Sequence, residues 1–126
     1  MRRVVLDASA LLSWFGPSPS GRALRAEYEQ GLLSVVAPPQ LTADMLSSLA
    51  GSPKERLLRV AAELDRLGFE LREPPIDELA SWLAQGLTAR QAGYAALASS
   101  LDLPLVTGDP ELLSRATTVA RSLADG

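Results

Sequence analysis

The segment Arg3-Val4-Val5-Leu6-Asp7-Ala8-Ser9 begins as an apolar run and ends in a carboxylate and a hydroxyl. A run of Val and Leu this short predicts a strand buried on both faces, as in a parallel sheet, with Asp7 at its carboxyl end. Ligands of open α/β sheets bind at that edge, so Asp7 is a candidate site residue. Asp7 is equally well placed to cap a helix that begins near Ala8, and both interpretations stay open at this point.

The composition is that of an ordinary soluble globular protein, with 47% hydrophobic and 21% charged residues in 126. We expect a single domain over residues 1–126, located in the cytoplasm, because no signal peptide and no apolar run of about 20 residues is present. The chain contains no Cys and no His. Disulfides, imidazole catalysis and the usual zinc ligands are therefore excluded, and any bound metal must be held by oxygen.

The net charge of −3 argues against a generally basic surface for binding nucleic acid. The basic residues are nevertheless eleven Arg and a single Lys, Lys54. Because Arg contacts phosphate in a bidentate manner, this bias is compatible with a local phosphate-binding surface. A GC-rich genome would produce the same bias, and that is the simpler explanation.

Apolar runs alternate with amphipathic segments along the whole chain. This pattern predicts a layered α/β/α domain with a parallel sheet of four or five strands, the third of them near an edge. The expected strands are residues 3–6, 32–37, 69–72, 103–107 and 117–120. The expected helices are residues 9–15, 21–30 with Ser20 as cap, a helix after Pro38-Pro39, 54–67 with Ser52 and Pro53 as cap and first turn, 76–83, 88–101 and a short one from Pro110.

Several polar residues fall at one edge of this predicted sheet. Asp7 and Asp109 follow the first and fourth strands, and the ends of parallel strands share an edge. Asp44 lies in the first two turns of the helix after the second strand, and Gln91 in the first turn of the helix before the fourth. Three converging carboxylates without His predict a Mg²⁺ or Mn²⁺ site, because these hard cations prefer oxygen ligands.

Each of these residues also has an ordinary structural interpretation. Asp44 is a favourable first-turn acid, and Asp109 is a good cap before Pro110. Gln91 follows Thr88 in the spacing of a capping box, Thr-x-x-Gln, and for Gln91 this interpretation is the favoured one.

Four segments in order resemble the PIN domain, and most closely the VapC-type toxins of prokaryotic toxin–antitoxin pairs. The matching segments are Val5-Leu6-Asp7-Ala8-Ser9-Ala10-Leu11-Leu12, Pro38 with Asp44 six positions on, Leu87-Thr88-x-x-Gln91-Ala92-x-Tyr94-x-x-Leu97-Ala98, and Leu103-Pro104-Leu105-Val106-Thr107-Gly108-Asp109. The resemblance implies a PIN-like fold and Mg²⁺- or Mn²⁺-dependent endonucleolytic cleavage of RNA. It also implies a small antitoxin protein as partner and a homodimer. No association with a membrane is expected, because the sequence has no apolar run long enough to cross a bilayer.

The resemblance assigns roles to six residues. Asp7 and Asp109 are metal ligands, and Asp44, which replaces the usual Glu, binds the metal directly or through water. The metal would orient the scissile phosphate and lower the pKa of the attacking water. Gln91 replaces the usual Asp and removes a negative charge, so reduced activity is expected. The supporting residues are Ser9, Gln91 and Thr107.

A catalytically silent PIN fold, kept as an RNA- or protein-binding module, is the main alternative. A phosphoacceptor domain would need a Lys after a late strand, whereas Lys54 lies in mid-chain. Nucleotide-binding folds with a P-loop or a dinucleotide fingerprint are excluded because no strand is followed by their Gly-rich motifs.

Overall fold

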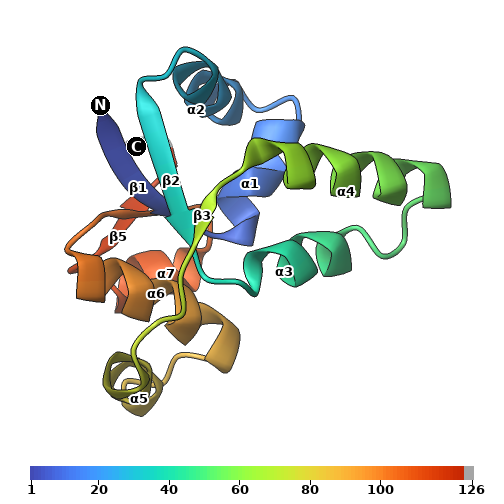
Figure 1. Cartoon of the computed structure of the whole chain (residues 1–126). Coiled ribbons are helices and arrows are strands. Elements are labelled where there is room, and N and C mark those ends of the chain that lie inside the picture. Colours follow the sequence, from blue (N-terminus) through green and yellow to red (C-terminus); the bar gives the residue numbers. More distant parts are fainter. Residues whose placement is uncertain (124–126) are drawn as a thin grey trace.

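A computed structural model describes residues 1–123. Its five strands form one sheet in the order β3-β2-β1-β4-β5, and every neighbouring pair is parallel (Figure 1). The strands are β1 (Arg2–Leu6), β2 (Leu33–Ala37), β3 (Glu70–Leu71), β4 (Leu105–Thr107) and β5 (Ala120–Ser122). The helices are α1 (Ala8–Phe15), α2 (Pro19–Glu29), α3 (Leu41–Ser48), α4 (Lys54–Leu67), α5 (Ile76–Ala84), α6 (Ala89–Leu101) and α7 (Pro110–Arg115).

Helices cover both faces of the sheet. Strands β2 and β3 are added on one side of β1, whereas β4 and β5 are added on its other side. Because crossovers between parallel strands are right-handed, the helices before β2 and the helices before β4 lie on opposite faces of the sheet. Helices α1 and α2 pack together on one face, and α6, backed by α5, packs on the other (Figure 1). The predicted three-layer α/β/α fold is therefore confirmed, with five strands and β3 at an edge.

The core lies on both faces of the central strands, against α1 and α2 on one face and α6 on the other. Val4, Val5 and Leu6 of β1 have no exposed surface, as expected for a strand covered on both faces. Helix α6 is buried along residues 92–98, a run rich in small side chains. Close packing of this helix against β1 and β4 fixes its first turn at the carboxyl edge of the sheet, beside the end of β4.

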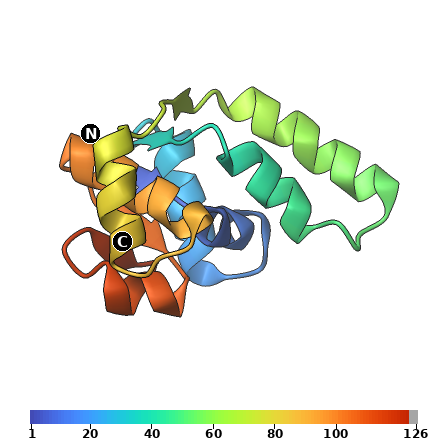
Figure 2. The ribbon, with the colours of Figure 1, turned by 90° about the horizontal axis from the view of Figure 1, so that it is seen from below.

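Helices α3 and α4 form an arm that extends from the body of the protein (Figures 1 and 2). In α4 only Val60 is fully buried. The helix ends at Gly68, whose φ of 64° lies in the left-handed region that favours glycine. The Tyr28 hydroxyl donates to the carbonyl of Leu67, which ties this end of the arm to α2.

Three local predictions are wrong. Ser18, and not Ser20, caps α2, because its side chain accepts from the Gly21 N–H and Pro19 takes the first helical position. Ser52 does not cap α4, where Pro53 is the N-cap and no side chain accepts a capping bond. The last strand is Ala120–Ser122 and not residues 117–120, because residues 117–119 form the turn after α7.

Residues 1–123 contain no helix with the length and apolar character that a bilayer crossing requires.

Candidate active site

A cavity of about 330 Å³ opens at the carboxyl edge of β1 and β4. Its walls come from the start of α1, the first two turns of α6 and the loop after β4. Edges of this kind are where open α/β sheets bind ligands. The lining residues are Asp7, Ala8, Ser9, Leu12, Ser48, Arg90, Gln91, Tyr94, Gly108, Asp109, Pro110 and Leu112.

Asp7 is the most deeply buried acid of this cavity, with 4% of its surface exposed. Its Oδ1 accepts from the Ala10 N–H at 2.9 Å, as the N-cap of α1, and from the Ser9 hydroxyl at 2.7 Å. Its Oδ2 accepts from the hydroxyl of Thr107, a residue without exposed surface. Asp7 therefore caps α1 and also lines the cavity. The helix cap and the position at the sheet edge, which the sequence left as alternatives, are both present.

Burial raises the pKa of the Asp7 carboxyl above its ordinary value, because desolvation disfavours the charged form. The hydrogen bonds from Thr107, Ala10 and Ser9 oppose this shift, and the negative charge of Asp109 adds to it. The cavity thus holds two carboxylates close enough to repel each other. A cation between them would relieve that repulsion.

Asp109 lies between β4 and α7 and caps that helix. Its Oδ1 accepts from the Glu111 N–H at 2.9 Å, and its Oδ2 accepts from Gln91 Nε2 at 3.2 Å. The backbone N–H of Asp109 donates to the Thr107 hydroxyl. One short chain of hydrogen bonds therefore joins the two acids through Thr107.

Gln91 completes the capping box of α6 that the sequence predicts. The Thr88 hydroxyl accepts from the Gln91 N–H, and Gln91 Oε1 accepts from the Thr88 N–H at 3.0 Å. Because Oε1 is used in this bond, the amide nitrogen must face Asp109. Gln91 thus presents a donor, and not an oxygen ligand, to the site.

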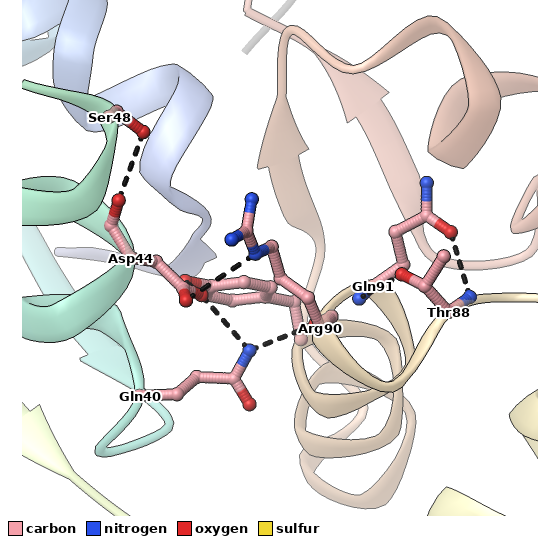
Figure 3. A network of polar contacts seen from close by, with 7 residues as sticks. Gln40, Asp44, Ser48, Thr88, Arg90 and Gln91 are labelled. Carbon is pink, nitrogen blue, oxygen red and sulfur yellow. Dashed lines mark hydrogen bonds and ion pairs between the residues drawn. The ribbon is translucent and has the colours of Figure 1, made fainter.

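Asp44 lies in the first turn of α3 and is held by three neighbours (Figure 3). Its Oδ2 accepts from the Tyr94 hydroxyl at 2.7 Å and from Gln40 Nε2 at 3.1 Å, and its Oδ1 lies 3.4 Å from Arg90 Nε. Burial, reinforced by the bond to Asp44 and by its charge, raises the pKa of the Tyr94 hydroxyl. Tyr94 therefore stays protonated and donates to Asp44 throughout the physiological range.

The structure brings five of the six predicted site residues into direct contact and places the sixth beside them. Asp7, Ser9, Thr107, Asp109 and Gln91 form one hydrogen-bonded set. Asp44 does not line the cavity but pairs with a residue that does. Within residues 1–123, no three acids come together closely enough to form a metal-binding group.

Sequence reasoning did not single out Arg90, Gln40 or the role of Tyr94. Arg90 precedes Gln91 in the first turn of α6, so its position at the same edge follows from the reasoning that places Gln91 there. Gln40 has no comparable signal in the sequence, because its contacts with Asp44 and with the Arg90 carbonyl join separate elements.

Asp7 and Asp109 have the chemistry and the free acceptor positions to hold a hard divalent cation. A carboxylate has about four acceptor positions, and the hydrogen bonds described above occupy three on Asp7 and two on Asp109. Both acids thus keep positions for a cation. Mg²⁺ in proteins is commonly bound by one or two carboxylates, with water and substrate phosphate as the other ligands.

Comparisons with known proteins agree with the architecture. No protein-family model matches the chain, and no curated protein sequence matches it. Among solved structures, PAE2754 from Pyrobaculum aerophilum is 25% identical, with a TM-score of 0.72 over 97% of this chain and 90% of that one. VapBC-1 from nontypeable Haemophilus influenzae is 17% identical, with a TM-score of 0.71 over 96% of this chain and 98% of that one. The fold described here is thus shared, over nearly its whole length, with both of these structures.

Proposed function

We propose that this protein is a metal-dependent endoribonuclease of the PIN/VapC toxin type. The observation that carries the proposal is the meeting of Asp7 and Asp109, from opposite ends of the sequence, in one cavity at the carboxyl edge of the sheet. The shared fold with VapBC-1 supports it.

In this proposal Asp7 and Asp109 hold a Mg²⁺ or Mn²⁺ ion. When bound, such an ion positions the scissile phosphodiester and lowers the pKa of the attacking water. Ser9 and Thr107 act on Asp7 by donating to its two oxygens, which fixes the carboxylate plane before the ion arrives. The sequence-based prediction of a third ligand from Asp44 is not part of this proposal, because its carboxylate is engaged by Arg90, Tyr94 and Gln40.

Gln91 lowers the activity that we expect from this site. A carboxylate at this position would add negative charge beside Asp109 and strengthen cation binding. The amide instead donates a hydrogen bond to Asp109 and occupies one of its acceptor positions. We therefore expect weak metal binding that is completed by oxygens of the substrate.

The test is cleavage of a structured RNA in Mg²⁺ and in Mn²⁺, compared with EDTA. Wild type is expected to cut only with metal, and Asp7→Asn and Asp109→Asn are expected to lose cleavage. Gln91→Glu is the informative gain-of-function variant, because Glu keeps the acceptor for the Thr88 N–H and adds a carboxylate. Asp77→Asn, an exposed acid of α5, is the matched control and keeps wild-type cleavage.

A catalytically silent RNA- or protein-binding module is the second candidate, and the hydrogen bond from Gln91 to Asp109 favours it. If wild type does not cut RNA in either metal while Gln91→Glu or Gln91→Asp does, the site is an inactivated nuclease and this second function is correct. If no variant cuts RNA and none binds metal, the nuclease proposal for this cavity fails.

A small antitoxin protein and a second copy of the chain are the partners that the proposed function implies. Coexpression with a small antitoxin protein, sought among the products of neighbouring genes, is expected to abolish cleavage. Light scattering after gel filtration is expected to give twice the chain mass of 13.4 kDa. A monomer at micromolar concentration would contradict the expected homodimer.

A further inference from the structure

Arg90 is the one basic residue among the described residues that line the candidate active-site cavity. It lies in the first turn of α6, next to Gln91, and its side chain is 61% exposed. The cavity therefore combines two carboxylates with one cationic side chain that solvent and ligands can reach. Neither the metal site nor the capping box of α6 uses this guanidinium.

Asp44 holds that guanidinium from one side. Its Oδ1 faces Arg90 Nε, while its other oxygen is fixed by Tyr94 and Gln40 (Figure 3). Gln40 Nε2 also donates to the backbone carbonyl of Arg90 at 2.9 Å. Gln40 thus holds the main chain of Arg90 and Asp44 holds its side chain, and these two residues are bonded to each other, which restricts the rotamers of Arg90.

The ion pair uses the Nε side of the guanidinium. A guanidinium has five N–H donors, four of them on its two terminal nitrogens. Within residues 1–123 those terminal nitrogens form no hydrogen bond, and no other acid pairs with Arg90. An oriented guanidinium with free terminal donors is a geometry suited to bidentate contact with a phosphate.

The same contacts make Asp44 a poor metal ligand. A divalent ion on its Oδ1 would lie beside the positive charge of Arg90, and its Oδ2 already accepts two hydrogen bonds. A divalent ion on Oδ1 of Asp44 would therefore compete with Arg90 for the same oxygen.

We propose that Arg90 binds a non-bridging phosphate oxygen of the RNA strand, and that Asp44 is the positioning residue that holds Arg90 for this contact and is not a metal ligand. The inference rests on the proposed ribonuclease function, because it places the phosphate next to the ion held by Asp7 and Asp109. Those acids bind the cation, and Arg90 neutralises charge on the other side of the phosphate.

The first test measures binding of a short fluorescent single-stranded RNA in EDTA, over a series of salt concentrations, so that no cleavage occurs. Arg90→Gln is expected to weaken binding on the order of tenfold and to reduce the slope of log K against log[salt] by about 0.7, the loss of one phosphate contact. Arg90→Lys keeps the point charge, so it should keep the slope while binding more weakly than wild type. Arg59→Gln, on the exposed face of α4, is the control and should behave as wild type.

The second test measures Mn²⁺ binding by calorimetry. Asp109→Asn is expected to lower Mn²⁺ affinity at least about tenfold, as for loss of a ligand. Asp44→Asn should stay within about twofold of the control Asp77→Asn, because the charge it removes is already paired with Arg90. Thermal melting checks that each variant is folded, and the side-chain oxygen of Asn can still accept from Tyr94.

Two results would overturn the inference while leaving the nuclease proposal intact. One is an Arg90→Gln protein that binds RNA like Arg59→Gln at every salt concentration. The other is an Asp44→Asn protein that loses Mn²⁺ affinity as strongly as Asp109→Asn, which would make Asp44 a metal ligand. If wild type itself binds neither RNA nor Mn²⁺, the proposed function fails, and this outcome is distinct from the other two.

Discussion

At the residue scale, Asp7 shows how one side chain serves both structure and chemistry. It caps α1 through the Ala10 N–H and lines the cavity with the rest of its carboxylate. Its pKa is raised because burial disfavours the charged carboxylate and because the negative charge of Asp109 lies nearby. Sites that bind a cation commonly carry such repulsion in the metal-free state, because the acids are arranged for the ion.

The stability of the metal-free protein is therefore expected to depend on pH through Asp7. The pKa of Asp7 is higher in the folded state than in the unfolded state, where it has the ordinary value of 3.8. The folded state therefore keeps the proton of this carboxyl to a higher pH than the unfolded state does. The contribution of Asp7 to the free energy of unfolding falls as the pH rises from the unfolded-state pKa through the folded-state pKa. Its destabilising effect is complete at neutral pH. Asp7→Asn is expected to raise the free energy of unfolding at pH 7 in EDTA, because it removes the buried charge.

Urea unfolding at pH 7 and near pH 4 checks this prediction, since the gain should shrink as the wild-type carboxyl becomes protonated. Asn keeps an acceptor for Ala10 and gains a donor for the Thr107 hydroxyl, so the local bonds survive. Asp77→Asn is the control for the loss of one charge. A destabilised Asp7→Asn protein at pH 7 would mean that the hydrogen bonds outweigh the desolvation of the carboxylate.

A charge added at position 91 should change metal binding and stability in opposite directions. Gln91→Glu places a third carboxylate beside Asp109 and removes the amide donor. We expect Mn²⁺ affinity to rise on the order of tenfold, because affinity grows with ligand charge, and the melting temperature in EDTA to fall through repulsion between the acids. Calorimetry and thermal melts test the two effects, and unchanged Mn²⁺ affinity would place position 91 outside the metal site.

At the scale of elements, the close approach of α1 and α2 depends on a glycine. A Cβ on Gly21 would lie 2.1 Å from the Ser13 carbonyl oxygen and 2.8 Å from the Trp14 nitrogen, both backbone atoms of α1. These atoms cannot swing away as a flexible side chain would. The sequence places Gly21 at the start of a helix, but only the packing of α1 explains why Ala does not fit there.

Gly21→Ala is expected to destabilise the protein despite the higher helix propensity of Ala, which favours the substitution by about 1 kcal/mol. Overpacking against a fixed backbone costs about 1–3 kcal/mol, so the net effect should be a loss, or a shift of α2 away from α1. Gly51→Ala is the matched control, because nothing lies within 4 Å of its Cβ position and its φ is not positive. Urea unfolding of both variants checks the prediction, and equal stability of the two would refute it.

The arm formed by α3 and α4 is the element expected to open first. Val60 is the only fully buried residue of α4, whereas α6 is buried along residues 92–98. Elements with few buried apolar contacts exchange their amide hydrogens through local opening of low free energy. Hydrogen exchange is expected to be faster in α4 than in β1 and α6, and Tyr28→Phe, which removes the bond to Leu67, should accelerate it further at residues 64–67. Equal protection of α4 and α6 would contradict this.

At the scale of the whole molecule, the parallel sheet assembles the site from distant parts of the chain. Asp7 and Asp109 become neighbours because β1 and β4 are adjacent in the sheet, with Leu6 paired to Val106. Binding of the proposed metal ion is therefore expected to be coupled to folding, since the unfolded chain cannot hold these acids together.

Mn²⁺ is expected to raise the melting temperature of the whole protein. A ligand that binds only the folded state adds about 2.7 kcal/mol at a concentration 100 times its dissociation constant, which corresponds to a rise of several degrees for a chain of this size. Asp109→Asn should remove most of the rise, and Arg59→Gln should retain it. A rise that persists in Asp109→Asn would place the ion elsewhere on the protein.

Local patterns in the sequence are sufficient for the layered fold and for much of the site. The Val and Leu run before Asp7 predicts β1, the Thr-x-x-Gln spacing predicts the capping box of Gln91, and the shared edge of parallel strands predicts that Asp7 and Asp109 meet. Each of these inferences concerns neighbours along the chain or a general rule of sheet geometry, so no knowledge of side-chain contacts is needed. The sequence misplaces the cap of α2, because Ser18 and Ser20 are both good capping residues. It also misplaces the start of the last strand, because residues 117–119 form a turn.

Only the tertiary structure decides what each polar group does once the segments meet. It directs the Gln91 amide nitrogen toward Asp109 because the amide oxygen is taken by Thr88, and it pairs Asp44 with Arg90 because α3 and α6 face each other across the rim of the cavity. The physical reason is that hydrogen bonds and ion pairs act over a few ångströms and depend on direction. The sequence of this protein therefore determines which groups reach the edge of the sheet, whereas the packing of its helices determines which of them are left free to bind a ligand.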